Sequence, residues 1–286
     1  IEESVKMFNV TRLPESGPWP TSDPFLFCVH HKDNYPIANQ NMGPKDSLSN
    51  RNLGNDFSNM NGWSMYHGTI VPGFPRHPHR GFETITIVEK GLIDHSDSMG
   101  FSARYGDGDV QWLTAGDGIQ HSEMFPLLNQ NEKNPIDFFQ IWINLNSKNK
   151  RVTPNFKMFW KNELPKFIET DQDNLKTQVE IIAGSYKNQK APTPPKNSWA
   201  NNIENSVNIW KIKLDKKANF ILPKVDKDIK RTLYFYKGDK ILVNEIEIKS
   251  RSMIEITNNN QVSISSLDNH TYILLLQAKP INEPVV

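Results

Sequence analysis

Two pairs of ligand-type residues share one spacing in this chain of 286 residues: His77 with His79, and His121 with Glu123. In a β-strand, residues i and i+2 point to the same face of the sheet, so each pair would present two ligand-type side chains together. Two such strands facing each other across a small barrel would bring three imidazoles and one carboxylate to one point. This pattern predicts a β-barrel with a metal site inside it in the first half of the chain.

Short runs of β-branched or alternating apolar residues occur along the whole sequence. In the first half, the run 84–88 lies between Gly81 and Gly91, and the run 139–145 is apolar at every second position. Many short strands with frequent turns predict a sandwich or barrel, so we expect an all-β protein with only short helices, such as one around 163–168. The corresponding runs in the second half are 210–214, 233–236, 241–243, 246–248, 262–264 and 272–276.

The chain is long enough for two domains of ordinary size, each with its own core. A polar break at 147–154 predicts an N-terminal metal-binding domain of residues 1–148 and a C-terminal domain of residues 149–286 without a metal site. The segment 34–61 is rich in Asn, Ser and Gly and is long for a plain connection, so we expect a lid or an interface there.

Composition excludes several classes of function. Thirty-three basic and 32 acidic residues leave a net charge of +1, which does not supply the basic stripe of a nucleic-acid-binding protein. The single cysteine, Cys28, rules out an intrachain disulfide and a thiolate metal cluster. No apolar run approaches the ~18 residues of a membrane helix, and the start does not resemble a signal peptide. We expect a cytoplasmic monomer without membrane contact, and we expect a few residues to be missing before Ile1.

The ligand set limits the choice of metal. Three imidazoles and a carboxylate suit Fe(II), Mn, Ni, Co, Cu or Zn, but not Ca or Mg, which prefer shells of oxygen. A six-coordinate ion held by four protein ligands keeps two positions open, whereas a structural zinc site is usually closed. His30, His31 and His95 lack such partners, so we expect ordinary surface or loop roles for them.

Further side chains near the motifs are candidates for the surroundings of the metal. Glu83 lies four residues after His79, and because Glu123 would complete the ligand set, we assign Glu83 to hydrogen bonding with a ligand. Three apolar residues, Phe82, Trp112 and Met124, are candidates for a pocket wall, although each could equally belong to the core.

The segments 74–84 (FPRHPHRGFET) and 108–124 (GDVQWLTAGDGIQHSEM) resemble the pirin family of bicupins, and the segments 23–26 and 280–286 resemble its two ends. The resemblance implies two cupin-type β-barrels packed face to face. It also implies one divalent metal, usually iron, bound by His77, His79, His121 and Glu123, and no metal in the second barrel. Two departures stand out: the 34–61 loop is longer than in typical pirins, and the chain stops at Val286, which suggests a truncated C-terminus.

Two main functions follow from the resemblance. The first is a dioxygenase that cleaves quercetin-like flavonols with O2, in which the metal orients a small aromatic substrate and Glu123 accepts its hydroxyl proton as a general base. The second is a metal- or redox-sensing interaction protein or coregulator that binds a protein partner without turnover, because fold alone does not decide function. A purely structural metal site is a third reading.

Overall fold

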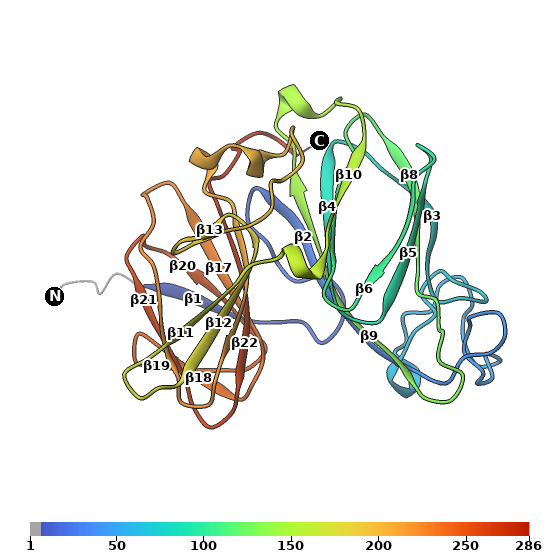
Figure 1. The fold of residues 1–286 in the computed structure, drawn as a ribbon, viewed down its shortest axis with the longest axis horizontal. Helices are drawn as coiled ribbons and strands as arrows, with labels where there is room; N and C mark the ends of the chain where they lie inside the picture. The colour runs from blue at the N-terminus through green and yellow to red at the C-terminus, as the bar shows by residue number, and fades with distance from the viewer. Residues whose placement is uncertain (1–6, 286) are drawn as a thin grey trace. The chain divides into compact units, whose positions relative to one another are not determined.

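The computed structural model describes residues 7–285 and contains almost only β-strands (Figure 1). The chain divides into two compact units, one formed by Cys28–Lys161 and the other by the segment ending at Phe27 together with the segment beginning at Asn162. The expected all-β architecture of two cupin-type units is therefore confirmed. Their face-to-face packing stays a prediction.

The unit Cys28–Lys161 consists of two facing antiparallel sheets, which carry the predicted metal-binding motifs (Figure 1). The five-stranded sheet has the order β10-β7-β4-β9-β2, and the four-stranded sheet has the order β3-β8-β5-β6. The strands of the first are β2 (Phe25–Tyr35), β4 (Phe82–Lys90), β7 (Val110–Thr114), β9 (Asn134–Asn144) and β10 (Asn155–Phe159); those of the second are β3 (Gly73–His79), β5 (Leu92–Asp97), β6 (Ser102–Gly106) and β8 (Ile119–Met124).

The pairing of β4 with β9 determines which side chains face the four-stranded sheet. Thr86 lies directly opposite Gln140, and the Gln140 side chain donates hydrogen bonds to Thr86 Oγ1 (3.3 Å) and to Glu123 Oε1 on β8 (3.0 Å). Because side chains alternate along a strand, the even-numbered residues of β4 from Phe82 to Val88 face the inside of this unit. The odd-numbered residues Glu83, Ile85 and Ile87 face the other side, where each is buried.

The second unit is built around a seven-stranded sheet with the order β1-β20-β17-β22-β15-β12-β11 and a four-stranded sheet with the order β16-β21-β18-β19. Alternating apolar residues of both sheets, such as Ile212 and Leu233 on one and Phe220 and Ile264 on the other, form one core. The strands are β1 (Phe8–Arg12), β11 (Lys166–Thr170), β12 (Lys176–Ala183), β15 (Asn208–Leu214), β16 (Asn219–Leu222), β17 (Lys230–Lys237), β18 (Lys240–Val243), β19 (Ile246–Lys249), β20 (Ser252–Ile256), β21 (Val262–Ser266) and β22 (Thr271–Ala278), with a small hairpin of β13 (Ser185–Tyr186) and β14 (Gln189–Lys190).

Short 3-10 turns are the only helical elements among the described residues. They are η1 (Met60–Gly62), η2 (Ser147–Asn149), η3 (Lys161–Glu163), η4 (Trp199–Asn201) and η5 (Ile203–Asn205). The helix expected around 163–168 is wrong, because Lys166–Thr170 alternates exposed and partly buried residues and pairs with β12 as the edge strand β11.

The domain boundaries also differ from the expected division at residue 148. Strand β1 pairs with β20, so the N-terminal segment completes the second unit, and its Phe8 lies in that unit's core. At the other boundary, β10 pairs with β7 and so belongs to the unit Cys28–Lys161. Both differences arise from pairings between segments far apart in the sequence.

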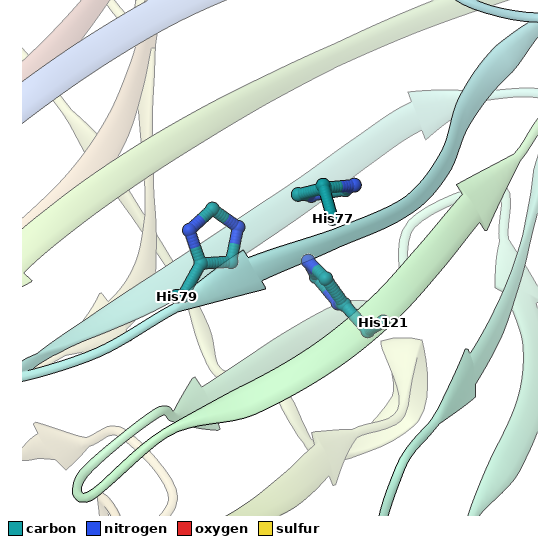
Figure 2. Close-up of side chains that lie close together, drawn as sticks. All are labelled: His77, His79 and His121. Atoms are coloured by element: carbon teal, nitrogen blue, oxygen red, sulfur yellow. The ribbon is translucent and has the colours of Figure 1, made fainter.

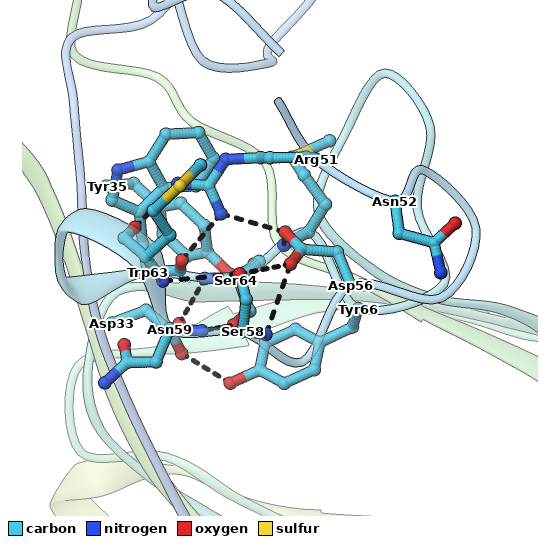
Figure 3. A network of polar contacts seen from close by, with 12 residues as sticks. Asp33, Tyr35, Arg51, Asn52, Asp56, Ser58, Asn59, Trp63, Ser64 and Tyr66 are labelled. Carbon is cyan, nitrogen blue, oxygen red and sulfur yellow. Dashed lines mark hydrogen bonds and ion pairs between the residues drawn. The ribbon is translucent and has the colours of Figure 1, made fainter. Parts of the chain in front are cut away.

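The loop between β2 and β3 is organised around a buried arginine (Figure 3). The guanidinium of Arg51 donates to Asp56 Oδ2 (2.8 Å) and to the Trp63 carbonyl (2.8 Å), and it lies 3.2 Å from the centre of the Trp63 ring. Asp33 on β2 accepts hydrogen bonds from the Ser64 backbone and the Tyr66 hydroxyl, both at 2.8 Å. These contacts give the loop an internal polar core, and its expected role as a lid or an interface stays a prediction.

Candidate metal centre

Neighbouring strands β3 and β8 bring the two sequence pairs together. His77 lies directly opposite His121 in the β3–β8 register. One nitrogen each of His77, His79 and His121 lies within 4.8 Å of the others, a spacing that lets three imidazoles bind one metal ion (Figure 2). His77 and His79 therefore point to the same side of β3, as their i, i+2 spacing predicts.

The turn before β8 needs glycine. Gly116 has a φ of +52°, and a Cβ atom there would overlap the carbonyl oxygen of Val152. A larger residue would strain this turn, which leads directly into the strand that carries His121.

Glu123 lies beside the three histidines, and its two carboxylate oxygens have different surroundings. Its Oε2 is 3.5 Å from His121 Nε2 and 3.7 Å from His77 Nε2. Its Oε1 accepts a hydrogen bond from Gln140, whose own carbonyl oxygen accepts one from Trp142 Nε1 (2.9 Å). The five-stranded sheet therefore holds one oxygen of Glu123 and leaves the other facing the imidazoles.

The donor set fits a metal ion. His77 Nδ1 lies 2.7 Å from the Pro75 carbonyl, which can only accept, so Nδ1 carries the proton and Nε2 keeps a lone pair. His79 Nε2 and His121 Nε2 are buried and have no hydrogen-bond partner among the described residues. Buried polar atoms rarely remain unpaired, and a bound metal would satisfy both.

The surroundings of His79 and His121 lower the pKa of both side chains and so favour their neutral forms. Burial, and to a smaller extent the neighbouring histidines, lower the pKa of His79 to about 4 and that of His121 to about 3. A neutral imidazole offers a lone pair, so the site is ready to bind a cation at neutral pH.

A buried pair behind His121 differs from the sequence expectation. Instead of the expected surface or loop role, His95 lies on β5, opposite Glu123, and is 2% exposed. Its Nδ1 lies 3.4 Å from His121 Nδ1, and its Nε2 lies 2.7 Å from Asp97 Oδ2. The sequence contains a signal for this pair, because His95 and Asp97 share the i, i+2 spacing of the two ligand pairs.

Of the candidate surrounding residues, Phe82 lies next to the histidines. Its ring centre is 5.3 Å from that of His79 and 4.7 Å from that of Trp142, which in turn lies 5.3 Å from His79. Sequence analysis missed Trp142 and Gln140. Both lie on the inward face of β9, at the same i, i+2 spacing.

Glu83, Trp112 and Met124 face away from the site. Glu83 and Trp112 lie on the outward face of the five-stranded sheet, where Glu83 accepts a hydrogen bond from Thr114 (2.8 Å) and Trp112 packs near Phe159. Met124 follows Glu123 directly, so its side chain points to the opposite face of β8. The expected roles of these three residues beside the metal are therefore corrected.

The fold and the site together define a cupin with a three-histidine centre, and comparisons identify its family. A family model described as Pirin matches residues 11–143. The chain is 31% identical over 230 residues to a protein of Arabidopsis thaliana provisionally named pirin-like, covering 78% of each chain. It is 27% identical over 214 residues to a Pseudomonas aeruginosa protein provisionally named a quercetin 2,3-dioxygenase, covering 75% of this chain and 70% of the relative.

A solved structure shows the same fold over nearly the whole chain. Quercetin 2,3-dioxygenase from Acinetobacter baumannii superimposes with a TM-score of 0.73 at 21% identity, covering 98% of this chain and 89% of the other. The chain belongs to the pirin family. Among the described residues, no helix is long and apolar enough to span a membrane.

Proposed function

We propose that this pirin-family protein binds one divalent transition-metal ion through His77, His79, His121 and Glu123 and acts as a dioxygenase on flavonol-like aromatic substrates. The observation that carries the proposal is the convergence of three imidazoles on one point, with one oxygen of Glu123 beside His77 and His121. The His77 side chain is 29% exposed, so the centre is open to solvent on that side. The provisional name of the Pseudomonas relative supports the same reaction class.

The surroundings of the centre suit a flat aromatic substrate. Phe82 and Trp142 place two rings beside His79, and Phe74 lies with its ring centre 6.4 Å from that of His77. The β2–β3 loop extends this aromatic surface, because Phe57, which is 52% exposed, contacts Phe74 at 6.4 Å between ring centres. Apolar rings with a few polar groups at one end are typical of small-molecule sites.

Each polar residue then has a distinct task. When bound, the metal would supply Lewis acidity toward a substrate hydroxyl and a redox centre for dioxygen, with iron(II) as the expected ion. Glu123 Oε2 faces the histidines and accepts the hydroxyl proton, while Gln140 holds Oε1. The hydrogen bond from Trp142 fixes the orientation of the Gln140 amide, so the base keeps its position through the reaction.

The test combines metal analysis with an oxygen assay. Protein purified without added metal is analysed for its metals, stripped, and reloaded separately with Fe(II), Mn, Ni, Co and Cu. We expect flavonol-dependent O2 uptake with at least one ion and none with the His79→Ala/His121→Ala variant. Stoichiometric metal without O2 uptake for any of the five ions would contradict the dioxygenase proposal and favour the metal-sensing interaction protein.

A further inference from the structure

His121 differs from His77 in what lies behind it. His77 Nδ1 donates to a backbone carbonyl, whereas His121 Nδ1 faces a second imidazole, that of His95. His95 in turn contacts Asp97, and both side chains are fully buried. The β5–β8 register places Asp97 opposite His121 and His95 opposite Glu123, so these four side chains occupy one face of the four-stranded sheet.

The hydrogen-bond roles along this row follow from the aspartate. A carboxylate can only accept, so the contact with Asp97 Oδ2 (2.7 Å) places a proton on His95 Nε2. With that proton on Nε2, Nδ1 of His95 can accept a hydrogen bond from Nδ1–H of His121, 3.4 Å away. That tautomer leaves the lone pair of His121 on Nε2, the buried nitrogen that lies 3.5 Å from Glu123.

The aspartate is itself fixed in place. Its other oxygen, Oδ1, accepts hydrogen bonds from the backbone N–H groups of Met99 (2.8 Å) and Phe101 (3.2 Å) in the turn after β5. The ring of Phe156 covers His95, with 5.1 Å between ring centres. The β5–β6 turn therefore determines where Asp97 points, and neither member of the pair is open to solvent.

We propose that Asp97 and His95 are positioning residues that hold His121 in the Nδ1–H tautomer with its Nε2 lone pair aimed at the metal position. This inference rests on the metal site of the proposed function but not on its reaction. Partners behind a ligating histidine fix its tautomer and raise its basicity, and their loss typically costs about 10- to 100-fold in metal affinity.

The first measurement needs neither metal nor activity. Long-range ¹H–¹⁵N correlation spectra of histidine-labelled, metal-free protein near neutral pH report which ring nitrogen carries the proton. We expect His121 to be protonated on Nδ1 and His95 on Nε2, with His95→Phe and His121→Phe providing the assignments. A His121 ring protonated on Nε2 would overturn the proposal.

The second measurement is Zn²⁺ affinity by competition with a chromogenic chelator. His95→Phe removes the acceptor and should lower the affinity about 10- to 100-fold. His95→Asn places a carbonyl oxygen near the lost Nδ1 and should recover most of that loss. Asp94→Asn is the matched control, because Asp94 lies on the same strand but pairs with Arg104 at the surface. The Zn²⁺ affinity of this variant should equal that of the parent.

The outcomes separate positioning from packing. Unchanged affinity in His95→Phe would mean that His95 acts only by filling space, and equal losses in His95→Phe and His95→Asn would mean that the acceptor at Nδ1 does not matter; either result would overturn the proposal. Absence of flavonol oxidation would contradict the proposed function but leave the tautomer and the Zn²⁺ affinities as they are, so the two failures are distinguishable.

Discussion

Replacing Glu123 with glutamine is expected to weaken metal binding, although the two side chains have the same size. Trp142 donates to the Gln140 carbonyl oxygen, so Gln140 presents its amino group to Glu123 Oε1. An amide at position 123 would turn its carbonyl oxygen toward Gln140. Its NH2 group would then occupy the Oε2 position, 3.5 Å from His121 Nε2 and 3.7 Å from His77 Nε2, where a ligand oxygen is needed.

The size of the effect follows from the cost of the alternative orientation. If the introduced amide turned its oxygen to the metal, its amino group would face that of Gln140, and a buried donor without an acceptor costs about 1–3 kcal/mol. Since about 1.4 kcal/mol corresponds to a factor of ten, Glu123→Gln should lose roughly 5- to 150-fold in metal affinity. Loss of the negative charge adds to this, and turnover should also fall by about 10²–10⁴, the usual contribution of a general base.

A double exchange provides the decisive comparison. In Glu123→Gln/Gln140→Glu, the carboxylate at position 140 accepts from Trp142 and from the amino group of the new side chain at position 123. The amide oxygen at position 123 is then free to face the histidines. Zn²⁺ titration should therefore show tighter binding by the double variant than by Glu123→Gln alone. If Glu123→Gln binds Zn²⁺ like the parent, or the double exchange recovers nothing, the hydrogen-bond reasoning is refuted.

Three further predictions concern the metal and stability. His79→Ala/His121→Ala should hold no stoichiometric metal by elemental analysis, and one retained equivalent would contradict the ligand assignment. Arg51→Ala leaves the buried Asp56 without its cation, so urea denaturation should show a free energy of unfolding lower by about 3–5 kcal/mol. The control Arg80→Ala breaks an exposed ion pair and should lower it by about 0–1 kcal/mol; similar losses in the two variants would contradict a stabilising role of Arg51 in the loop. The pKa of His79 is lowered from 6.5 to about 4, so between these values His79 binds more protons in the unfolded chain. Over this range the free energy of unfolding of the metal-free protein should fall more steeply with falling pH than that of His79→Phe, and equal slopes for the two proteins would refute the shift.

The convergence of His77, His79 and His121 could be predicted from the sequence because the spacing of the motifs is local. Two i, i+2 pairs on strands require only alternation, and the same rule would have drawn attention to His95 with Asp97 and to Gln140 with Trp142. The rule also predicts that Met124 faces away from Glu123. The error there came from treating nearness in sequence as nearness in space.

Other features depend on information that no local pattern contains. Glu83 was expected on the inward face of β4 but lies on the outward face. The polarity of the strand does not reveal this, because the inward face carries the polar Thr84 and Thr86 and the outward face carries the apolar Ile85 and Ile87. The partner of β1 is β20, more than two hundred residues away, and the partner of β10 is β7 across the expected boundary. Which strands pair over such distances depends on how the whole sheet assembles, and no short stretch of sequence shows it.

The pairing of β1 with β20 has a consequence for synthesis on the ribosome. The unit Cys28–Lys161 is continuous, so all of its strands are available once that segment has emerged. Strand β1, however, must wait for β20, because Phe8–Arg12 pairs with Ser252–Ile256. Until then β1 has no sheet to join, and unpaired strands favour pairing with other chains. A nascent chain that stalls before β20 is made should therefore keep its N-terminal strand available to a chaperone or a protease.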